Sequence, residues 1–230
     1  WEGGREHTHT HARLFSPLPS LPTRFSWNYG LVHFVAISTE IFFDHPAMVP
    51  AMLKWLEADL KTAQANRTSA PWIIVHGHRP LYCSCDGDCD GAATAVRTGV
   101  ERLFFEYGVD LYICGHEHDY ERMYDIAPHK NLLHPWLSGK TTKATTNMPA
   151  TTYIVVGSAG NQENHEPFQR PKPERTAIAL NEYGYGRLIV YNSSHLKWQF
   201  VVTDGSAKPR PKYDVIGDEV VLVQEKHGPF

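Results

Sequence analysis

The chain has 230 residues, of which 42% are hydrophobic, and it carries a formal net charge of −3 with a sequence pI near 6.5. A chain of this length and composition can bury one substantial core, so we expect one globular domain. The mild acidity argues against a nucleic-acid partner, which normally meets a basic patch. No apolar run approaches the roughly 18 residues needed to span a bilayer, which argues against a membrane partner.

Residues 1–24 differ in composition from the remainder. Three histidines alternate with threonine at residues 7–11, and three prolines follow within residues 17–22. Such a low-complexity segment cannot bury a core, so we expect it to be extended or disordered and its histidines to have no functional role. Because the chain begins at Trp1 without an apolar leader, we interpret it as a fragment or a processed form.

The globular pattern begins at Trp27, and residues 31–38 are typical of a strand. Pro46 then precedes a stretch whose apolar residues recur at helical spacing, and these are Met48, Met52, Trp55, Leu56, Leu60 and Ala63. We interpret them as core packing rather than as a cofactor site. The apolar run at residues 72–75 is the next predicted strand.

A helix and another strand follow. Residues 97–107 have an amphipathic helical pattern, Gly108 stands where glycine commonly ends a helix, and residues 111–114 are typical of a strand. The order strand, helix, strand indicates a mostly parallel sheet. The carboxyl ends of strands 72–75 and 111–114 should therefore meet at one edge of that sheet.

Residues 127–150 are predicted to form a long polar loop. The sequence resumes as a strand at residues 152–156 and enters a Gly-Ser-Ala-Gly turn at residues 157–160. Glycines permit the backbone to approach a ligand, but a purely structural turn fits this short motif equally well.

The C-terminal part alternates between apolar and polar residues. Residues 186–191 and 196–203 flank a short polar turn, which predicts an antiparallel hairpin. Beyond them, we expect residues 206–230 to be a tail in which only residues 219–223 could add an edge strand.

Two predicted strands lead into histidine motifs, HGH at residues 76–78 and GHEH at residues 115–118. Gly115 would let the backbone turn where a side chain would obstruct it. Residues two apart in an extended segment project to the same side, so His116 and His118 should face one point. Imidazole suits zinc, iron, copper or nickel, so the motif does not name the metal.

We predict that both histidines of the GHEH motif and His78 are metal ligands. His76 is better interpreted as a core or supporting histidine. Glu121 and Arg122 follow the second motif directly, and we expect them to form an ion pair that fixes the loop.

Three of the four cysteines, Cys83, Cys85 and Cys89, cluster within seven residues, and Cys114 lies in a predicted strand. The cluster favours a disulfide or surface thiols. A separate soft-metal site is the alternative, although the paired C-x-x-C spacing of zinc sites is absent.

Several stretches together resemble the C-terminal half of the purple acid phosphatases, secreted binuclear metallophosphoesterases. They are IIVHGHRPLYCS at residues 73–84, YGVDLYICGHEHDYER at 107–122, YIVVGSAGNQE at 153–163, and the segments 25–40 and 183–188. The motif GHxHxYER is narrower than the GHxH of calcineurin-like phosphoesterases in general.

The resemblance implies an α/β fold, a metallophosphoesterase-type β-sandwich flanked by helices. It assigns residues 25–205 to the C-terminal portion of the catalytic domain, with the N-terminal part of that domain missing. Family motifs of the types GDxG, GDxxY and GNHE, which supply the remaining metal ligands, are absent from this sequence.

By the same resemblance, His78 and His116 would bind one metal ion and His118 the other. The centre would hold iron together with zinc, manganese or a second iron. No catalytic residue can be assigned, because Cys83 to Asp88 occupy the place where plant members carry phosphate-binding histidines.

The implied activity is that of an acid phosphatase, in which a hydroxide held by the metal ions hydrolyses a phosphate monoester. We expect it to be impaired in this chain, because three histidines divided between two ions leave each poorly held. The alternatives are a non-catalytic remnant or binding module and a metallophosphodiesterase. Two Asn-x-Ser/Thr glycosylation motifs, at Asn66 and Asn192, weakly favour a secreted glycoprotein.

Overall fold

The computed structural model describes residues 23–85, 89, 91–128, 136–137, 142–203 and 215–230. The expectations for residues 1–22 and their histidines therefore lie outside the described residues. Among the described helices, none is long and apolar enough to cross a membrane.

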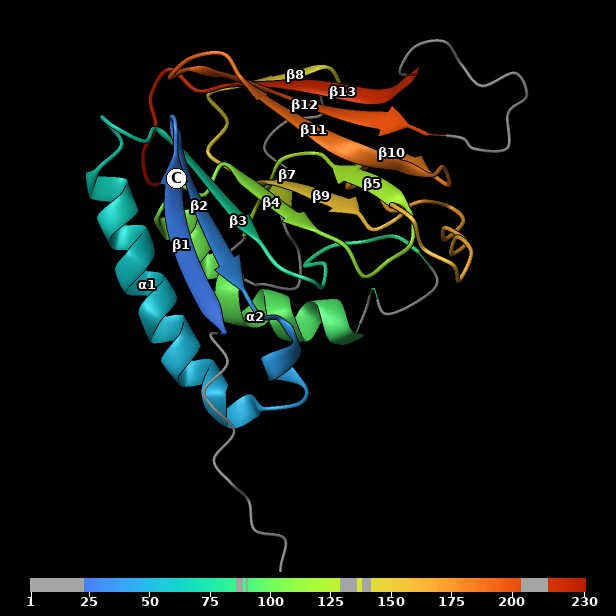
Figure 1. The fold of residues 1–230 in the computed structure, drawn as a ribbon, viewed down its shortest axis with the longest axis horizontal. Coiled ribbons are helices and arrows are strands. Elements are labelled where there is room, and N and C mark those ends of the chain that lie inside the picture. Colours follow the sequence, from blue (N-terminus) through green and yellow to red (C-terminus); the bar gives the residue numbers. More distant parts are fainter. Residues whose placement is uncertain (1–22, 86–88, 90, 129–135, 138–141, 204–214) are drawn as a thin grey trace, which may run out of the picture.

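Seven strands form the larger sheet (Figure 1). They are β1 (Arg24–Tyr29), β2 (Val32–Ile37), β3 (Trp72–His76), β4 (Leu111–Cys114), β5 (Tyr120–Met123), β9 (Thr152–Val156) and β10 (Thr176–Leu180). Their spatial order is β1-β2-β3-β4-β9-β5-β10. The central four, β2, β3, β4 and β9, are parallel to one another, and the outer strands pair antiparallel.

A second sheet has four strands in the order β11-β12-β13-β8. They are β8 (Ala144–Thr146), β11 (Gly184–Val190), β12 (His195–Val202) and β13 (Val215–Val223). Two short strands, β6 (Ile126–Ala127) and β7 (Trp136–Leu137), form a separate pair. The helices are α1 (Val49–Ala65) and α2 (Gly91–Glu106), preceded by the 3₁₀ turns η1 (Glu40–Phe42) and η2 (Pro46–Met48).

The three layers follow from the alternation of side chains along the strands. On β3, Ile73 and Val75 belong to the core shared with the helices, whereas Trp72 and Ile74 belong to the core shared with the second sheet. Figure 1 shows both helices on one side of the larger sheet and the four-stranded sheet on the other. Because both faces are covered, the central strands are apolar throughout rather than alternating.

Most predicted elements are confirmed, including the parallel pair β3 and β4, the hairpin β11–β12 and the helix end at Gly108, whose φ is +64°. Helix α2 starts at Gly91, six residues before the predicted start, because the sequence from Gly91 to Val96 is rich in alanine, a strong helix former with little apolar signal.

Two predictions about the second sheet are wrong. The supposed polar loop at residues 127–150 contains β8, and the strand expected at an edge is β13, which lies between β12 and β8. Pairing between distant segments explains both differences. β8 is only three residues long and pairs in parallel with the end of β13, which places β13 inside the sheet. A strand this short has no recognisable period in sequence.

Candidate metal centre

The two histidine motifs lie side by side because they leave neighbouring parallel strands. The Gly77 N–H donates to the Ile113 carbonyl at 3.2 Å, and the Gly115 N–H donates to the His78 carbonyl at 3.0 Å. A Cβ at Gly77 would lie 2.7 Å from the Tyr112 hydroxyl oxygen, so glycine is required for this close approach. The sheet therefore continues into the loops and fixes their relative position.

The structure brings His78 and His116 into contact. His116 Nδ1 lies 3.1 Å from His78 Nε2, and the ring centroids are 4.9 Å apart. Two nitrogens bound about 2.0–2.1 Å from one cation are separated by about 3.0–3.4 Å, depending on the coordination angle. The observed separation fits two ligands of one metal ion.

His118 lies close enough to His78 for its charge to affect the pKa of His78. Burial lowers the pKa of His78, and the charges of His116, Arg79 and His118 lower it further, against the opposing effect of Glu40. Neutral imidazole is the form that binds metal. The cluster therefore favours the protonation state that a ligand set needs.

The loop after β9 holds the GHEH motif from the side. The carbonyl of His118 accepts a hydrogen bond from His165 Nδ1 at 2.6 Å, and its N–H donates to Glu166 Oε2 at 3.3 Å. Glu163 Oε2 lies 3.5 Å from His118 Nδ1. The sequence predicted a turn at residues 157–160, either structural or close to a ligand, and did not predict these three partners in the residues that follow it, although their carboxyl and imidazole groups were a usable signal.

The expected role of Gly115 is not supported. A Cβ at this position would meet only Gly157 Cα, at an ordinary 3.7 Å, and the left-handed residue in the loop is His116, with φ of +68°. The position that requires glycine is Gly157, where a Cβ would collide with the Glu117 carbonyl oxygen. Burial alternates along the loop, with Glu117 buried and the histidines on either side of it partly exposed. That His116 and His118 face one point stays a prediction, since the left-handed His116 departs from the extended backbone on which it rested.

Arg79 adds a positive charge beside the histidines. Its guanidinium lies 2.9–3.2 Å from both Glu40 carboxylate oxygens, and its Nη1 lies 3.1 Å from His116 Nε2. An arginine can only donate, so in this arrangement His116 carries its proton on Nδ1, toward His78. If His116 held a metal through Nδ1 as neutral imidazole, its proton would move to Nε2, so Arg79 would lose this acceptor and keep its partner Glu40.

Glu121 and Arg122 do not pair with each other, contrary to the prediction. Successive residues of a strand point to opposite faces. Arg122 reaches toward the second sheet and binds Asp218 with Nε at 2.7 Å, whereas Glu121 accepts the N–H and hydroxyl of Ser84 and the hydroxyl of Thr176 on the helix-facing side.

Acidic side chains gather beneath the histidine loop. Asp119 is buried, and neither carboxylate oxygen has a hydrogen-bond partner among the described residues. Burial raises the pKa of Asp119 to about 8, and the nearby Glu121, Glu117 and Glu166 contribute to that rise. The surroundings of the loop thus favour a cation.

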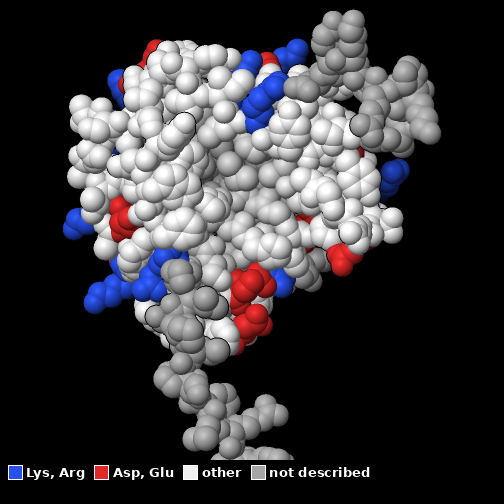
Figure 2. Space-filling model, viewed as in Figure 1, with Lys and Arg blue, Asp and Glu red and all other residues white. Residues whose placement is uncertain are grey.

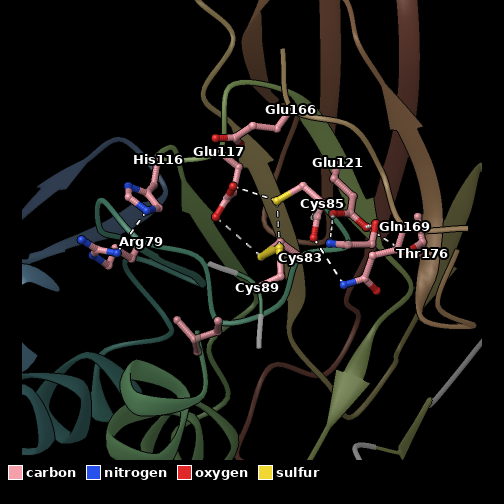
Figure 3. The surroundings of a disulfide bond; sticks show 12 residues. Arg79, Cys83, Cys85, Cys89, His116, Glu117, Glu121, Glu166, Gln169 and Thr176 are labelled. Carbon is pink, nitrogen blue, oxygen red and sulfur yellow. Dashed lines mark hydrogen bonds between the residues drawn. A yellow bond between two sulfur atoms is a disulfide. The ribbon is translucent and has the colours of Figure 1, made fainter. Parts of the chain in front are cut away.

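The cysteine cluster lies behind the same loop. Cys83 and Cys89 form a disulfide, which agrees with the favoured reading of the cluster, and Cys85 is buried next to it. Figure 3 shows Glu117 pointing toward these sulfurs, whereas His116 points toward Arg79.

His76 lies apart from these groups. Its ring meets Trp27 edge-on at 5.8 Å, and burial lowers its pKa. It lines an apolar hollow of about 330 Å³ together with Phe34, Ile74 and Val156. The role of His76 as a core or supporting histidine stays a prediction.

Two family models match the chain. The model described as calcineurin-like phosphoesterase matches residues 7–120, and the model described as iron/zinc purple acid phosphatase-like protein C matches residues 150–208. The chain is 38% identical over 237 residues to acid phosphatase type 7 of Danio rerio and 39% identical over 230 residues to acid phosphatase type 7 of Homo sapiens. These alignments cover 95% and 94% of this chain but 51% and 50% of the relatives, so the chain spans about half the length of the curated relatives it matches.

The fold is also similar to that of a solved structure, the purple acid phosphatase PPD1 from yellow lupin (Lupinus luteus) seeds. The TM-score is 0.69 at 22% sequence identity, and the match covers 87% of this chain and 32% of the lupin chain. Identity this low bears on the fold alone, and it confirms the predicted metallophosphoesterase-type fold class.

Proposed function

The chain belongs to the purple acid phosphatase-like proteins of the calcineurin-like phosphoesterase superfamily, and from this premise we propose that it carries the histidine half of a binuclear metal centre for phosphate monoester hydrolysis. His78 and His116 would hold one ion and His118 the other. The proposed ions are iron with zinc, manganese or a second iron, in keeping with the iron/zinc description of the matching family model.

The observation that carries this proposal is the 3.1 Å contact between His116 Nδ1 and His78 Nε2. Both atoms are ligand atoms for borderline metals, and both loops are fixed by backbone hydrogen bonds from neighbouring strands. When bound, the ions would neutralise phosphoryl oxygens and activate water for attack on phosphorus.

The chain's own residues do the remaining work. His165 donates a hydrogen bond to the His118 carbonyl and so fixes the loop that carries two of the proposed ligands. Arg79, held by Glu40, keeps a positive charge at the edge that an anionic phosphate ester would approach. We propose that residues 25–205 are the C-terminal portion of the catalytic domain, whose remaining ligands come from sequence motifs outside this chain.

The ligand count predicts weak metal binding and slow hydrolysis by this polypeptide alone. A catalytic zinc site usually has three protein ligands, and the proposed division gives one ion two histidines and the other ion one. We further propose a secreted glycoprotein, on the support of the Cys83–Cys89 disulfide and of two exposed sequons at Asn66 and Asn192.

The test is metal binding by the oxidised chain, with the disulfide intact. Cobalt(II) titration and elemental analysis would compare the wild type with the His116→Ala/His118→Ala variant and with the exposed control His45→Ala. We expect binding without sulfur-to-cobalt charge transfer, lost in the double variant and kept in the control. Equal metal content in all three proteins would refute the proposed ligand set.

Activity assays then separate the alternative functions. A nitrophenyl phosphate monoester and the corresponding diester would be compared at fixed metal concentration. Slow monoester hydrolysis that disappears in the double variant supports the proposal, and faster diester hydrolysis indicates a phosphodiesterase. Metal-independent folding without binding or turnover would favour a non-catalytic module.

A further inference from the structure

The cysteine cluster contains more ligand groups than a disulfide needs. Besides the bonded Cys83 and Cys89, Cys85 Sγ lies 2.9 Å from Cys89 Sγ and 2.7 Å from Glu117 Oε2. Cys83 Sγ lies 4.0 Å from Glu117 Oε1. Three sulfurs and a carboxylate thus converge within 4.8 Å of one another (Figure 3).

All four groups are enclosed. The exposed fractions are 1% for Cys83, 0% for Cys85, 3% for Cys89 and 1% for Glu117. A structural metal site is closed in this way, whereas a catalytic site keeps an open position. The enclosure therefore suits an ion that holds the loops together rather than one that acts on a substrate.

The backbone that presents the sulfurs is independently fixed. Ser84 donates both its N–H and its hydroxyl to Glu121, and its carbonyl accepts the N–H of Gln169 at 2.8 Å. Cys85 forms an isolated β-bridge with Phe168. Cys83 and Cys85 therefore hold their positions whether or not the disulfide is present.

We propose that Cys83, Cys85, Cys89 and Glu117 form a redox-dependent site for a zinc-type cation. In the oxidised chain the Cys83–Cys89 disulfide closes the cluster, and in the reduced chain three thiolates and the Glu117 carboxylate bind one ion. Thiolate sulfur and carboxylate oxygen are established zinc ligands, and four of them complete a tetrahedron. This site is distinct from the histidine centre, from which it is separated by the backbone of the GHEH loop.

The conversion balances with an added phosphine and water. The phosphine gives two electrons to the Cys83–Cys89 bond and takes the oxygen of one water to become a phosphine oxide, and the two protons of that water leave two cysteine thiols. Zinc then displaces the protons of Cys83, Cys85 and Cys89 to solvent. Sulfurs about 2.3 Å from a tetrahedral zinc lie about 3.8 Å apart, so Cys83 and Cys89 must separate to that distance after reduction, and Cys85 Sγ and Cys89 Sγ must open to it from 2.9 Å.

Acidic neighbours favour a cation in this position. Glu121 and Asp119 are buried, and Glu121 accepts hydrogen bonds from Ser84, the residue between Cys83 and Cys85. Arg175, which donates to the Cys83 carbonyl, provides an opposing positive charge on the other side. A bound dication would compensate the negative charge of the thiolates in this enclosed place.

The experiment uses cobalt(II) as a spectroscopic probe in the whole chain, reduced anaerobically with a phosphine or left oxidised. We expect one equivalent bound with strong sulfur-to-cobalt charge-transfer absorption in the reduced chain and none of that absorption in the oxidised chain. Zinc should displace the cobalt and abolish the absorption. A reduced, folded chain without the absorption would overturn the proposal.

Matched variants locate the ligands. Cys85→Ser should weaken cobalt binding at least tenfold, whereas Cys114→Ser, which changes a buried cysteine outside the cluster, should retain the absorption. The His116→Ala/His118→Ala variant should also retain it, which separates this site from the histidine centre. Equal absorption in Cys85→Ser and the wild type would exclude Cys85 as a ligand and with it the proposed site. If a variant does not fold, native mass spectrometry of the reduced and the oxidised wild type decides, since the proposal requires one more zinc per chain in the reduced form than in the oxidised form.

Discussion

Gly157 illustrates how one residue without a side chain determines the geometry of the histidine loop. A Cβ there would collide with the Glu117 carbonyl oxygen, whereas a Cβ on Gly115 would make an ordinary contact at 3.7 Å. Backbone atoms cannot rotate away as a flexible side chain can. The close passage of two loops, rather than a tight turn in one of them, therefore requires the glycine.

We expect Gly157→Ala to destabilise the fold by about 1–3 kcal/mol, the usual cost of overpacking. Because the displaced atoms belong to the loop of His116 and His118, cobalt binding at the histidine centre should also weaken. Gly115→Ala is the matched control and should change the unfolding free energy by no more than about 1 kcal/mol, in either direction. Urea unfolding and cobalt titration measure both effects, and equal losses in the two variants would contradict this explanation.

At the scale of elements, a buried ion pair joins the two sheets. Asp218 on β13 accepts hydrogen bonds from Arg122 Nε and Nη2 at 2.7 and 3.0 Å and from the Tyr120 hydroxyl at 2.7 Å, both donors being on β5. The Tyr120 oxygen in turn accepts the Trp198 indole N–H at 3.1 Å. The pair fixes which residues of the second sheet lie against β5.

Removing one partner leaves the other charge buried, so Arg122→Met should cost about 3–5 kcal/mol of unfolding free energy. The exposed pair Arg102–Glu106 on α2 is the control, and Glu106→Gln should cost less than about 0.5 kcal/mol. Asp218→Asn keeps one acceptor oxygen, so its cost in unfolding free energy should lie between those of Arg122→Met and Glu106→Gln. Chemical denaturation gives all three values, and a cost for Arg122→Met as small as that of the control would rule out a structural role.

The sequence predicted elements with a clear local period and missed partners that arise from the fold. Helix α1, the strands β3 and β4, and the hairpin β11–β12 are confirmed because each carries its own apolar pattern. The partner of Arg122 could not be read from sequence, since Asp218 lies 96 residues away on another sheet. The histidine motifs predicted His78, His116 and His118 as ligands, which stays a prediction, but not that the loop at residues 161–166 contacts His118.

At the scale of the whole molecule, buried carboxyl groups link stability to pH. Asp125 is 2% exposed, and burial raises its pKa to about 6, although hydrogen bonds from Thr152 and Thr145 and the charge of Arg122 oppose the rise. The Thr152 hydroxyl lies 2.5 Å from Asp125 Oδ1. The native chain thus keeps a proton at pH values where an unfolded aspartate, with a pKa near 3.8, has lost it.

This difference sets the sign of the effect. The native state binds more protons than the unfolded state between about pH 4 and pH 6, so the contribution of Asp125 to the unfolding free energy is greatest below pH 4 and falls as pH rises through 6. The fall is about 3 kcal/mol at most for a shift of about two pKa units.

Asp125→Asn should remove this fall, because the amide does not ionise and can still accept from Thr152. Urea unfolding at pH 4 and pH 7.5 should therefore show the variant gaining stability relative to the wild type at the higher pH. Asp44→Asn, at an exposed site, should follow the wild type at both. A constant difference between Asp125→Asn and the wild type would mean that Asp125 is ionised in the native state throughout, with its charge balanced by Arg122.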